Sequence, residues 1–168
     1  MSCSHPGRWR VVIKVQSAKP DPEDVASLPG ADFADAYSTQ VPGHDLDTDT
    51  AAERLFARSP AWVTLLLILR NIIVMPFGLK TGADQDLSRD AVGIFPVIER
   101  RADYLLLGFD DKHQDFRVIV RIANEADAQT VTLTTVCRTH NLLGRTYLAT
   151  ILPFHRLIIR TMLSQVAP

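Results

Sequence analysis

Apolar and polar side chains alternate most regularly in the second half of the chain, at residues 115–122. The apolar side chains of one set are Phe116, Val118, Val120 and Ile122, and the positions between them are Arg117, Ile119 and Arg121. A period of two predicts a β-strand with one face toward the core. Short polar connectors separate this run from similar neighbouring runs, which favours antiparallel hairpins. The pattern therefore predicts a four-stranded antiparallel sheet formed by residues 91–98, 103–109, 115–122 and 129–138.

The first half of the chain contains two strand-like runs and one amphipathic segment. Residues 9–16 are rich in β-branched side chains, and residues 32–41 are predicted to form a second strand that ends at a Pro-Gly pair. Residues 47–58 are predicted to form a helix capped by Thr48 or Asp49. We expect residues 1–8 to be a disordered leader and residues 9–168 to form a single domain.

The most apolar segment, residues 60–74, predicts a helix that is apolar nearly all round. Such a helix is buried on several sides or lies in a subunit interface. Arg70 and Asn71 interrupt it. A membrane span over residues 62–79 would place Arg70 near the bilayer centre, at a cost of roughly 2.5–3.5 kcal/mol, so we predict a buried helix instead. A buried Arg requires a carboxylate or several carbonyl partners, and the candidate carboxylates are Asp32, Asp35 and Asp115.

A last amphipathic segment, residues 143–166, predicts a long C-terminal helix. His155 falls within its apolar stripe, and Pro153 is expected to kink the helix or divide it in two. An antiparallel sheet with helices segregated around it is typical of the α+β class. We expect the curved sheet to grip this helix and to leave a cavity between them. The apolar stripe consists of Leu148, Ile151, Leu152, Ile158, Ile159 and Met162.

Five blocks of sequence, spaced in order along the chain, carry a resemblance to a known family. They are Ala31-Asp-Phe-Ala-Asp-Ala-Tyr37, Arg70-Asn-Ile-Ile-Val-Met-Pro-Phe-Gly-Leu-Lys80, Gly108-Phe-Asp-Asp-Lys-His-Gln-Asp-Phe-Arg117, Thr139-His-Asn-Leu-Leu-Gly-Arg145 and Pro153-Phe-His-Arg156. In these blocks the chain resembles the bacterial domain of unknown function 2867 family. The resemblance implies a helix-grip fold, similar to the START and Bet v 1 type of ligand-binding proteins. It brings no agreed catalytic residues.

The candidate site residues lie mainly in the last two blocks. His140, Asn141 and Arg145 follow the last predicted strand, where they either cap the helix and pin the turn or form a site for an anion or a carbonyl group. His155 is either a hydrogen-bonded core histidine or a polar group that faces the cavity and orients a ligand. Arg70 is either half of a structural ion pair or a further ligand contact.

Charge and cysteine content narrow the range of partners. The net charge is −1, so the chain lacks the basic footprint of a nucleic-acid-binding protein. The last 31 residues nevertheless carry four Arg and no acidic residue, which hints at an anionic group or an acidic partner. Cys3 and Cys137 suggest neither a disulfide framework nor a zinc site, so we expect the protein to reside in a reducing cytoplasm. We also expect it to bind no metal and no cofactor.

Three functional hypotheses follow. The first is a soluble binding protein whose internal cavity holds a small, mostly apolar ligand, with His155, Arg145 and Arg70 as polar contacts. The second is an enzyme of the proton-transfer type, such as a cyclase, dehydratase or hydrolase, with His155 or His140 as acid or base. It requires a second titratable group within hydrogen-bond reach of the histidine. The third is an interaction module that uses helix 60–74 to form a homodimer or to dock a dehydrogenase-like partner.

Overall fold

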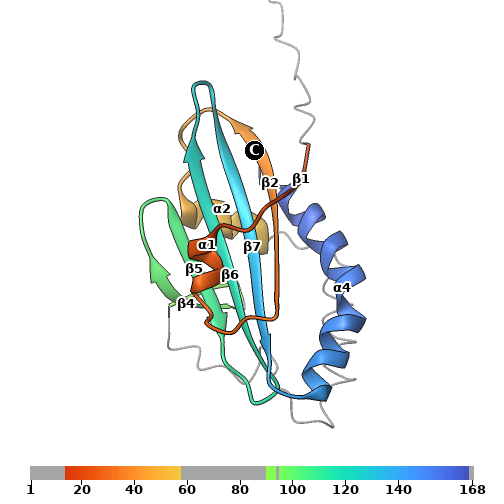
Figure 1. The fold of residues 1–168 in the computed structure, drawn as a ribbon. Helices are drawn as coiled ribbons and strands as arrows, with labels where there is room; N and C mark the ends of the chain where they lie inside the picture. Colours follow the sequence, from red (N-terminus) through yellow and green to blue (C-terminus); the bar gives the residue numbers. More distant parts are fainter. Residues whose placement is uncertain (1–13, 58–89, 94, 167–168) are drawn as a thin grey trace, which may run out of the picture.

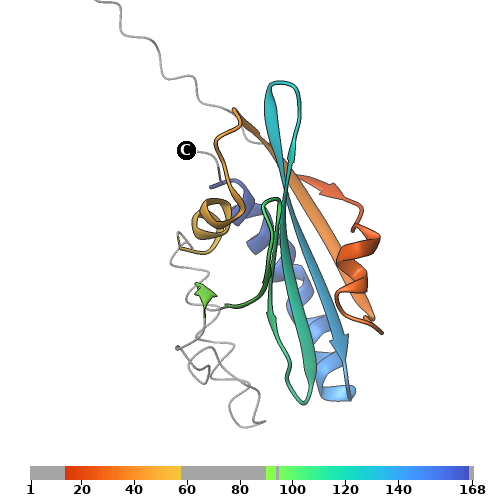
Figure 2. The same ribbon diagram turned by 90° about the vertical axis from the view of Figure 1, so that its left-hand side faces the viewer.

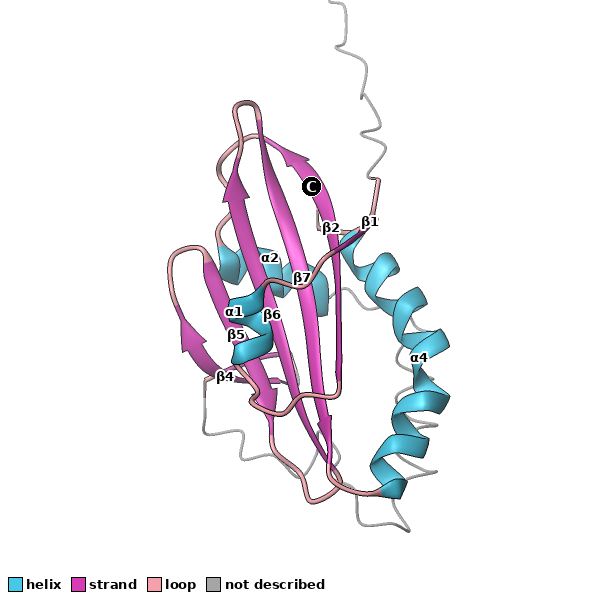
Figure 3. Ribbon diagram, in the orientation of Figure 1, coloured by secondary structure: helices cyan, strands magenta, loops and turns pink. Residues whose placement is uncertain are grey.

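The computed structural model describes residues 14–57, 90–93 and 95–166. Its centre is a twisted antiparallel sheet of seven strands in the order β1-β2-β7-β6-β5-β4-β3 (Figures 1 and 3). The strands from β3 to β7 form a meander, and β2 joins it beside β7. The strands are β1 (Gln16–Ala18), β2 (Phe33–Pro42), β3 (Ala91–Val92), β4 (Phe95–Arg100), β5 (Tyr104–Phe109), β6 (Gln114–Asn124) and β7 (Ala128–Thr139).

Helices lie on both faces of the sheet. The short helix α1 (Pro22–Ala26) lies on one face, and α2 (Thr48–Ala57) lies on the other (Figure 2). The long helix α4 (Leu142–Leu163) contacts β2, β7 and α2. The larger core lies between the sheet and these two longer helices, and it includes Leu55, Leu107, Leu133, Leu163 and Val166. A smaller core on the α1 side contains Leu28, Tyr104, Leu106, Ile119 and Val136.

The predicted class is confirmed: the fold is α+β, with an antiparallel curved sheet along which the C-terminal helix packs. Strands β5, β6 and β7 match the predicted runs to within about two residues at each end. The two faces of β6 also differ as predicted, because Val118, Val120 and Ile122 belong to the larger core and Ile119 belongs to the smaller one. Period-two alternation therefore located both faces of the sheet.

One predicted strand is wrong. Residues 91–98 do not form a single strand but a tight antiparallel hairpin of β3 and β4, in which Val92 pairs with Phe95. Gly93 adopts a φ of 62° at the turn, a conformation that a residue without a Cβ reaches at little cost. Strand β4, which lies between β3 and β5, then continues to Arg100, two residues beyond the predicted end.

Two local predictions also change, and one helix was not foreseen. Helix α2 is capped by Asp47, whose carboxylate accepts from the Thr50 N–H at 2.7 Å, and not by Thr48 or Asp49. Helix α1 was not predicted; it begins at Pro22 and is capped by Asp21, whose carboxylate accepts from the Glu23 N–H at 2.8 Å. Pro153 does not divide α4, which is continuous across it. The proline is exposed, so water can satisfy the carbonyl that loses its helical partner.

Several predictions fall outside the described residues. These are the leader, most of strand 9–16, helix 60–74 with Arg70, and the rejected span over residues 62–79. Within the described part of the chain, no helix is long and apolar enough to cross a membrane.

Candidate functional site

The interface between α4 and β2 is built of successive layers. Side chains on β2 alternate between the two faces, so Phe33, Asp35 and Tyr37 all point toward α4. The Phe33 ring lies edge-on to His155, and the Arg160 guanidinium lies 5.6 Å from the centre of the Tyr37 ring. Residue numbers increase in the same direction along β2 and α4, because Phe33 and Asp35 contact His155 and Tyr37 contacts Arg160. The helix therefore runs parallel to β2, and successive side chains on this face of β2 contact successive turns of α4.

In the first of these layers, an open groove of about 330 Å³ lies between the start of α4 and the adjoining ends of β2 and β7. Its apolar side chains come from both walls, and its polar groups are an aspartate, a threonine and an arginine. The lining residues are Asp32, Phe33, Thr139, Arg145, Leu148, Ala149 and Leu152. The groove therefore offers an apolar surface beside a small number of polar contacts, as ligand sites usually do.

Two of those polar groups already bond to each other. The Asp32 carboxylate accepts from the Thr139 backbone N–H at 3.2 Å and also from the Thr139 hydroxyl. These bonds fasten β2 to the end of β7. The third polar group, Arg145, is exposed on the first turns of α4. Its guanidinium therefore remains available to solvent or to a ligand at the groove.

The next layer holds a histidine–carboxylate pair. His155 Nε2 lies 3.2 Å from Asp35 Oδ1, and the two side chains are 15% and 18% exposed. The other carboxylate oxygen, Asp35 Oδ2, is buried and has no hydrogen-bond partner in the described structure. A buried acceptor left unpaired costs about 1–3 kcal/mol. A donor that formed a hydrogen bond to this oxygen would remove that cost.

The same sheet face continues into polar side chains on β7 and β6. Cys137 is 1% exposed and pairs in register with Phe33. Burial, followed by the negative charge of Asp35, raises the pKa of the Cys137 thiol to about 12, although a hydrogen bond with Gln114 opposes this. The thiol is therefore a neutral group at ordinary pH and not a nucleophile.

The turn between β7 and α4 is a structural junction. Asn141 caps α4, because its side-chain oxygen accepts from the Gly144 N–H at 3.0 Å. Its amide nitrogen lies 2.9 Å from His113 Nδ1 in the β5–β6 turn, and the His140 N–H donates to the His113 carbonyl. A Cβ added to Gly144 would lie 2.2 Å from that carbonyl oxygen. The junction thus requires glycine where the helix and the turn meet.

His140 belongs to a second ion-pair cluster around Asp115. The Asp115 carboxylate is 3.0 Å from His140 Nε2 and 2.7 Å from Arg138 Nη2. Burial alone would raise the pKa of Asp115, but the hydrogen bonds and charges of His140 and Arg138 outweigh it, and the pKa is lowered. His140 therefore contributes to the stability of the β6–β7 pairing and does not line the groove.

A pH dependence follows from the lowered pKa of Asp115. A carboxyl group with a lowered folded-state pKa stabilises the protein above the ordinary Asp pKa of about 3.9, and this contribution is lost as the pH falls through the folded-state pKa. We expect the free energy of unfolding of Asp115→Asn to fall less steeply than that of the wild type between about pH 5 and pH 2. Urea unfolding at several pH values measures it.

The matched control is Asp45→Asn, which removes an exposed carboxyl group from a loop. It should leave the pH profile close to that of the wild type. Parallel profiles for the wild type and Asp115→Asn would show that the ion pairs with His140 and Arg138 contribute nothing to stability.

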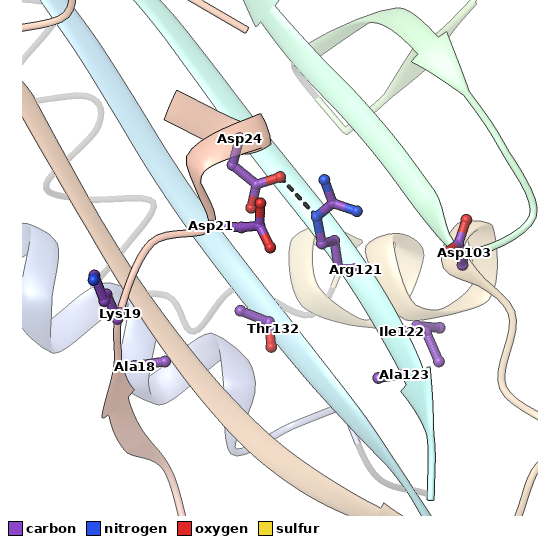
Figure 4. Close-up of a pocket in the computed structure, with 9 residues that line it drawn as sticks. All are labelled: Ala18, Lys19, Asp21, Asp24, Asp103, Arg121, Ile122, Ala123 and Thr132. Carbon is purple, nitrogen blue, oxygen red and sulfur yellow. Dashed lines mark hydrogen bonds and ion pairs between the residues drawn. The ribbon is translucent and has the colours of Figure 1, made fainter. Parts of the chain in front are cut away.

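A separate pocket of about 260 Å³ lies on the opposite face of the sheet, beside α1 (Figure 4). Its lining includes an ion pair with a buried carboxylate: Asp24 Oδ1 accepts from Arg121 Nε at 2.7 Å, while Asp24 Oδ2 accepts from the Thr134 hydroxyl at 2.8 Å. Both Asp24 oxygens are thus already satisfied. The pair fastens α1 to β6 and β7, and we assign it a structural role.

The predicted site residues separate into two groups. Arg145 and His155 both lie along the α4–β2 interface, whereas His140 and Asn141 are engaged in the β7–α4 junction, and Arg70 lies outside the described residues. Sequence reasoning assigned Asp35 only to Arg70 and missed its pairing with His155. The signal was present in β2, whose alternation places Phe33, Asp35 and Tyr37 on one face. Among the described residues, no three His, Cys, Asp or Glu side chains gather to hold a metal ion.

Comparison with known proteins gives one family and one similar structure. Residues 27–162 match the family model described as a protein of unknown function (DUF2867). No curated protein matches the chain. Among solved structures it is similar to CalU16 from Micromonospora echinospora, at 11% sequence identity and a TM-score of 0.29, over 89% of this chain and 91% of that one.

Proposed function

The chain belongs to the DUF2867 family, and from that premise we propose that it is a binding protein for a small, mostly apolar ligand. The ligand would lie in the groove between α4 and β2. The observation that carries this proposal is the combination of an apolar groove with a half-buried histidine–carboxylate pair in the next layer of the same interface. Apolar walls supply affinity in such sites, and a few polar groups supply orientation.

The dimensions and the chemistry of the groove support this proposal. Its volume of about 330 Å³ is close to the lower end of the range for ligand pockets, roughly 300–1,000 Å³. Phe33, Leu148 and Leu152 provide the apolar contact surface. Arg145 lies at the exposed side, where it can meet a polar substituent without being buried.

A second candidate function is proton-transfer catalysis on the same frame. It is favoured by one observation, namely that Asp35 lies 3.2 Å from His155 and so places a second titratable group within hydrogen-bond reach. With Nε2 directed at the carboxylate, Nδ1 is the nitrogen left to accept or donate a proton. A binding protein needs the pair only for orientation, so turnover of a bound ligand distinguishes the two functions.

Filling the groove tests the binding proposal. Leu152→Trp puts a larger side chain into the groove, and Leu157→Trp puts the same side chain on the exposed part of the same helix, where Leu157 is 55% exposed. We expect Leu152→Trp to weaken the binding of a naphthalene-based fluorescent probe by about tenfold or more. Leu157→Trp should bind as the wild type does.

Native mass spectrometry of the purified wild type complements this titration, since a retained small molecule would identify the natural ligand. Equal probe affinity in the two Trp variants would place binding elsewhere and refute the proposed groove. Thermal melts of both variants confirm that each is folded under the conditions of the titration.

A further inference from the structure

The buried side-chain atoms that lack partners on the α4-facing side of β2 and β6 are both acceptors. Asp35 Oδ2 and Gln114 Oε1 have no hydrogen-bond partner in the described structure. Gln114 is 9% exposed, and its amide already bonds to the Cys137 thiol. A carboxylate oxygen can only accept, and an amide oxygen can only accept. The unpaired atoms on the face that a ligand would meet are therefore acceptors, and what this face lacks is hydrogen-bond donors to pair with them.

Asp35 does not line the groove but lies in the layer next to it. Phe33 and Leu152 both line the groove, and Asp35 and His155 follow them by two and three positions on the same faces of β2 and α4. Phe33 also touches His155, with ring centres 6.3 Å apart. A ligand that fills the groove thus ends against the layer that contains Asp35 Oδ2.

We infer that the ligand carries a hydrogen-bond donor, an amine or a hydroxyl group, at the end that meets Asp35. The inference rests on the proposed function and specifies its ligand class. A donor would satisfy Asp35 Oδ2, whereas a carboxylate in the same place would be repelled by Asp35 and would leave that oxygen unpaired. Cys137 does not alter this balance, because its thiol is neutral. Among the residues that line the groove, the one cationic side chain is Arg145, which lies at the exposed side and away from Asp35.

Four probes with one apolar body test the inference: naphthylmethylamine, naphthylmethanol, naphthoic acid and methylnaphthalene. Their affinities are measured by fluorescence titration and calorimetry on the full chain. We expect the amine and the alcohol to bind about tenfold more tightly than the acid and the methyl compound. Asp35→Asn is expected to abolish the preference for the amine, while Asp127→Asn, which alters an exposed carboxyl in the β6–β7 turn, should preserve it.

Each outcome decides the matter. The ranking on the wild-type chain is itself a test, so the inference stays falsifiable if Asp35→Asn folds poorly. Tightest binding by naphthoic acid would assign the polar end to Arg145 and overturn the inference. Equal affinities for all four probes would overturn it too but leave the proposed function standing. Failure of all four to bind would overturn both.

Discussion

Arg121→Leu is expected to lower the free energy of unfolding by about 3–5 kcal/mol, because it leaves a buried carboxylate without its counter-charge. Asp24 is 1% exposed and lies 2.7 Å from the Arg121 guanidinium, whose side chain is 22% exposed. Leucine retains much of the apolar stem beside the Tyr104 ring on β5, so the loss reports mainly on the unpaired charge. Urea unfolding followed by circular dichroism measures it.

Arg101→Leu provides the matched control for this prediction. Arg101 also pairs with Glu23, at 2.8 Å, and also lies over the Tyr104 ring, but its side chain is 48% exposed. An exposed ion pair contributes only about 0–1 kcal/mol, so this variant should be nearly as stable as the wild type. Adding Asp24→Asn to Arg121→Leu should recover part of the lost stability. Similar losses for Arg101→Leu and Arg121→Leu would contradict the assignment of a buried pair.

Leu163→Ala is expected to cost about 2–5 kcal/mol, the usual range for a large-to-small change in a packed core. Leu163 is fully buried between α4, α2 and the sheet. The control, Leu157→Ala, makes the same change on the same helix at a side chain that is 55% exposed. It should cost less than about 1 kcal/mol. Thermal and urea unfolding of both variants would refute the packing of α4 if the two losses were equal.

The core-facing side of α4 was largely predictable because its apolar positions repeat with the helical period. Ile159 and Met162 belong to the predicted stripe and are buried, whereas Ile158 is only partly buried. The stripe is wider than the contact, so the pattern identifies the side of the helix but not the degree of burial at each position. The hairpins β5–β6 and β6–β7 were predictable for a similar reason, since each closes through a short polar connector.

The β3–β4 hairpin was not predictable in the same way. Its turn lies within a run of apolar residues, and Gly93 is the one local sign of it. A glycine inside a strand-like run is equally compatible with a bulge or a close backbone approach. The choice among these depends on what packs against the segment, here the Phe56 ring on α2, which lies 5.3 Å from that of Phe95.

The candidate site shows the same division between local and distant information. His155 was identified from its place in the stripe, which is local. Its partner Asp35 lies 120 positions away, and no local pattern says which strand will lie beside α4. The strand order that brings β2 next to β7 and beneath α4 results from the packing of the whole sheet.

That 120-residue separation also has a consequence for the time course of folding. Contacts between distant segments close large loops and form slowly, while the β4–β7 hairpins are local and can form early. On the ribosome, β2 is synthesised well before α4. Until α4 is available to cover it, the apolar face of the sheet remains exposed, and an exposed apolar face promotes aggregation. A ligand that bridges β2 and α4 would bind only after this last step, and ligand binding would therefore report that synthesis and folding of the domain are complete.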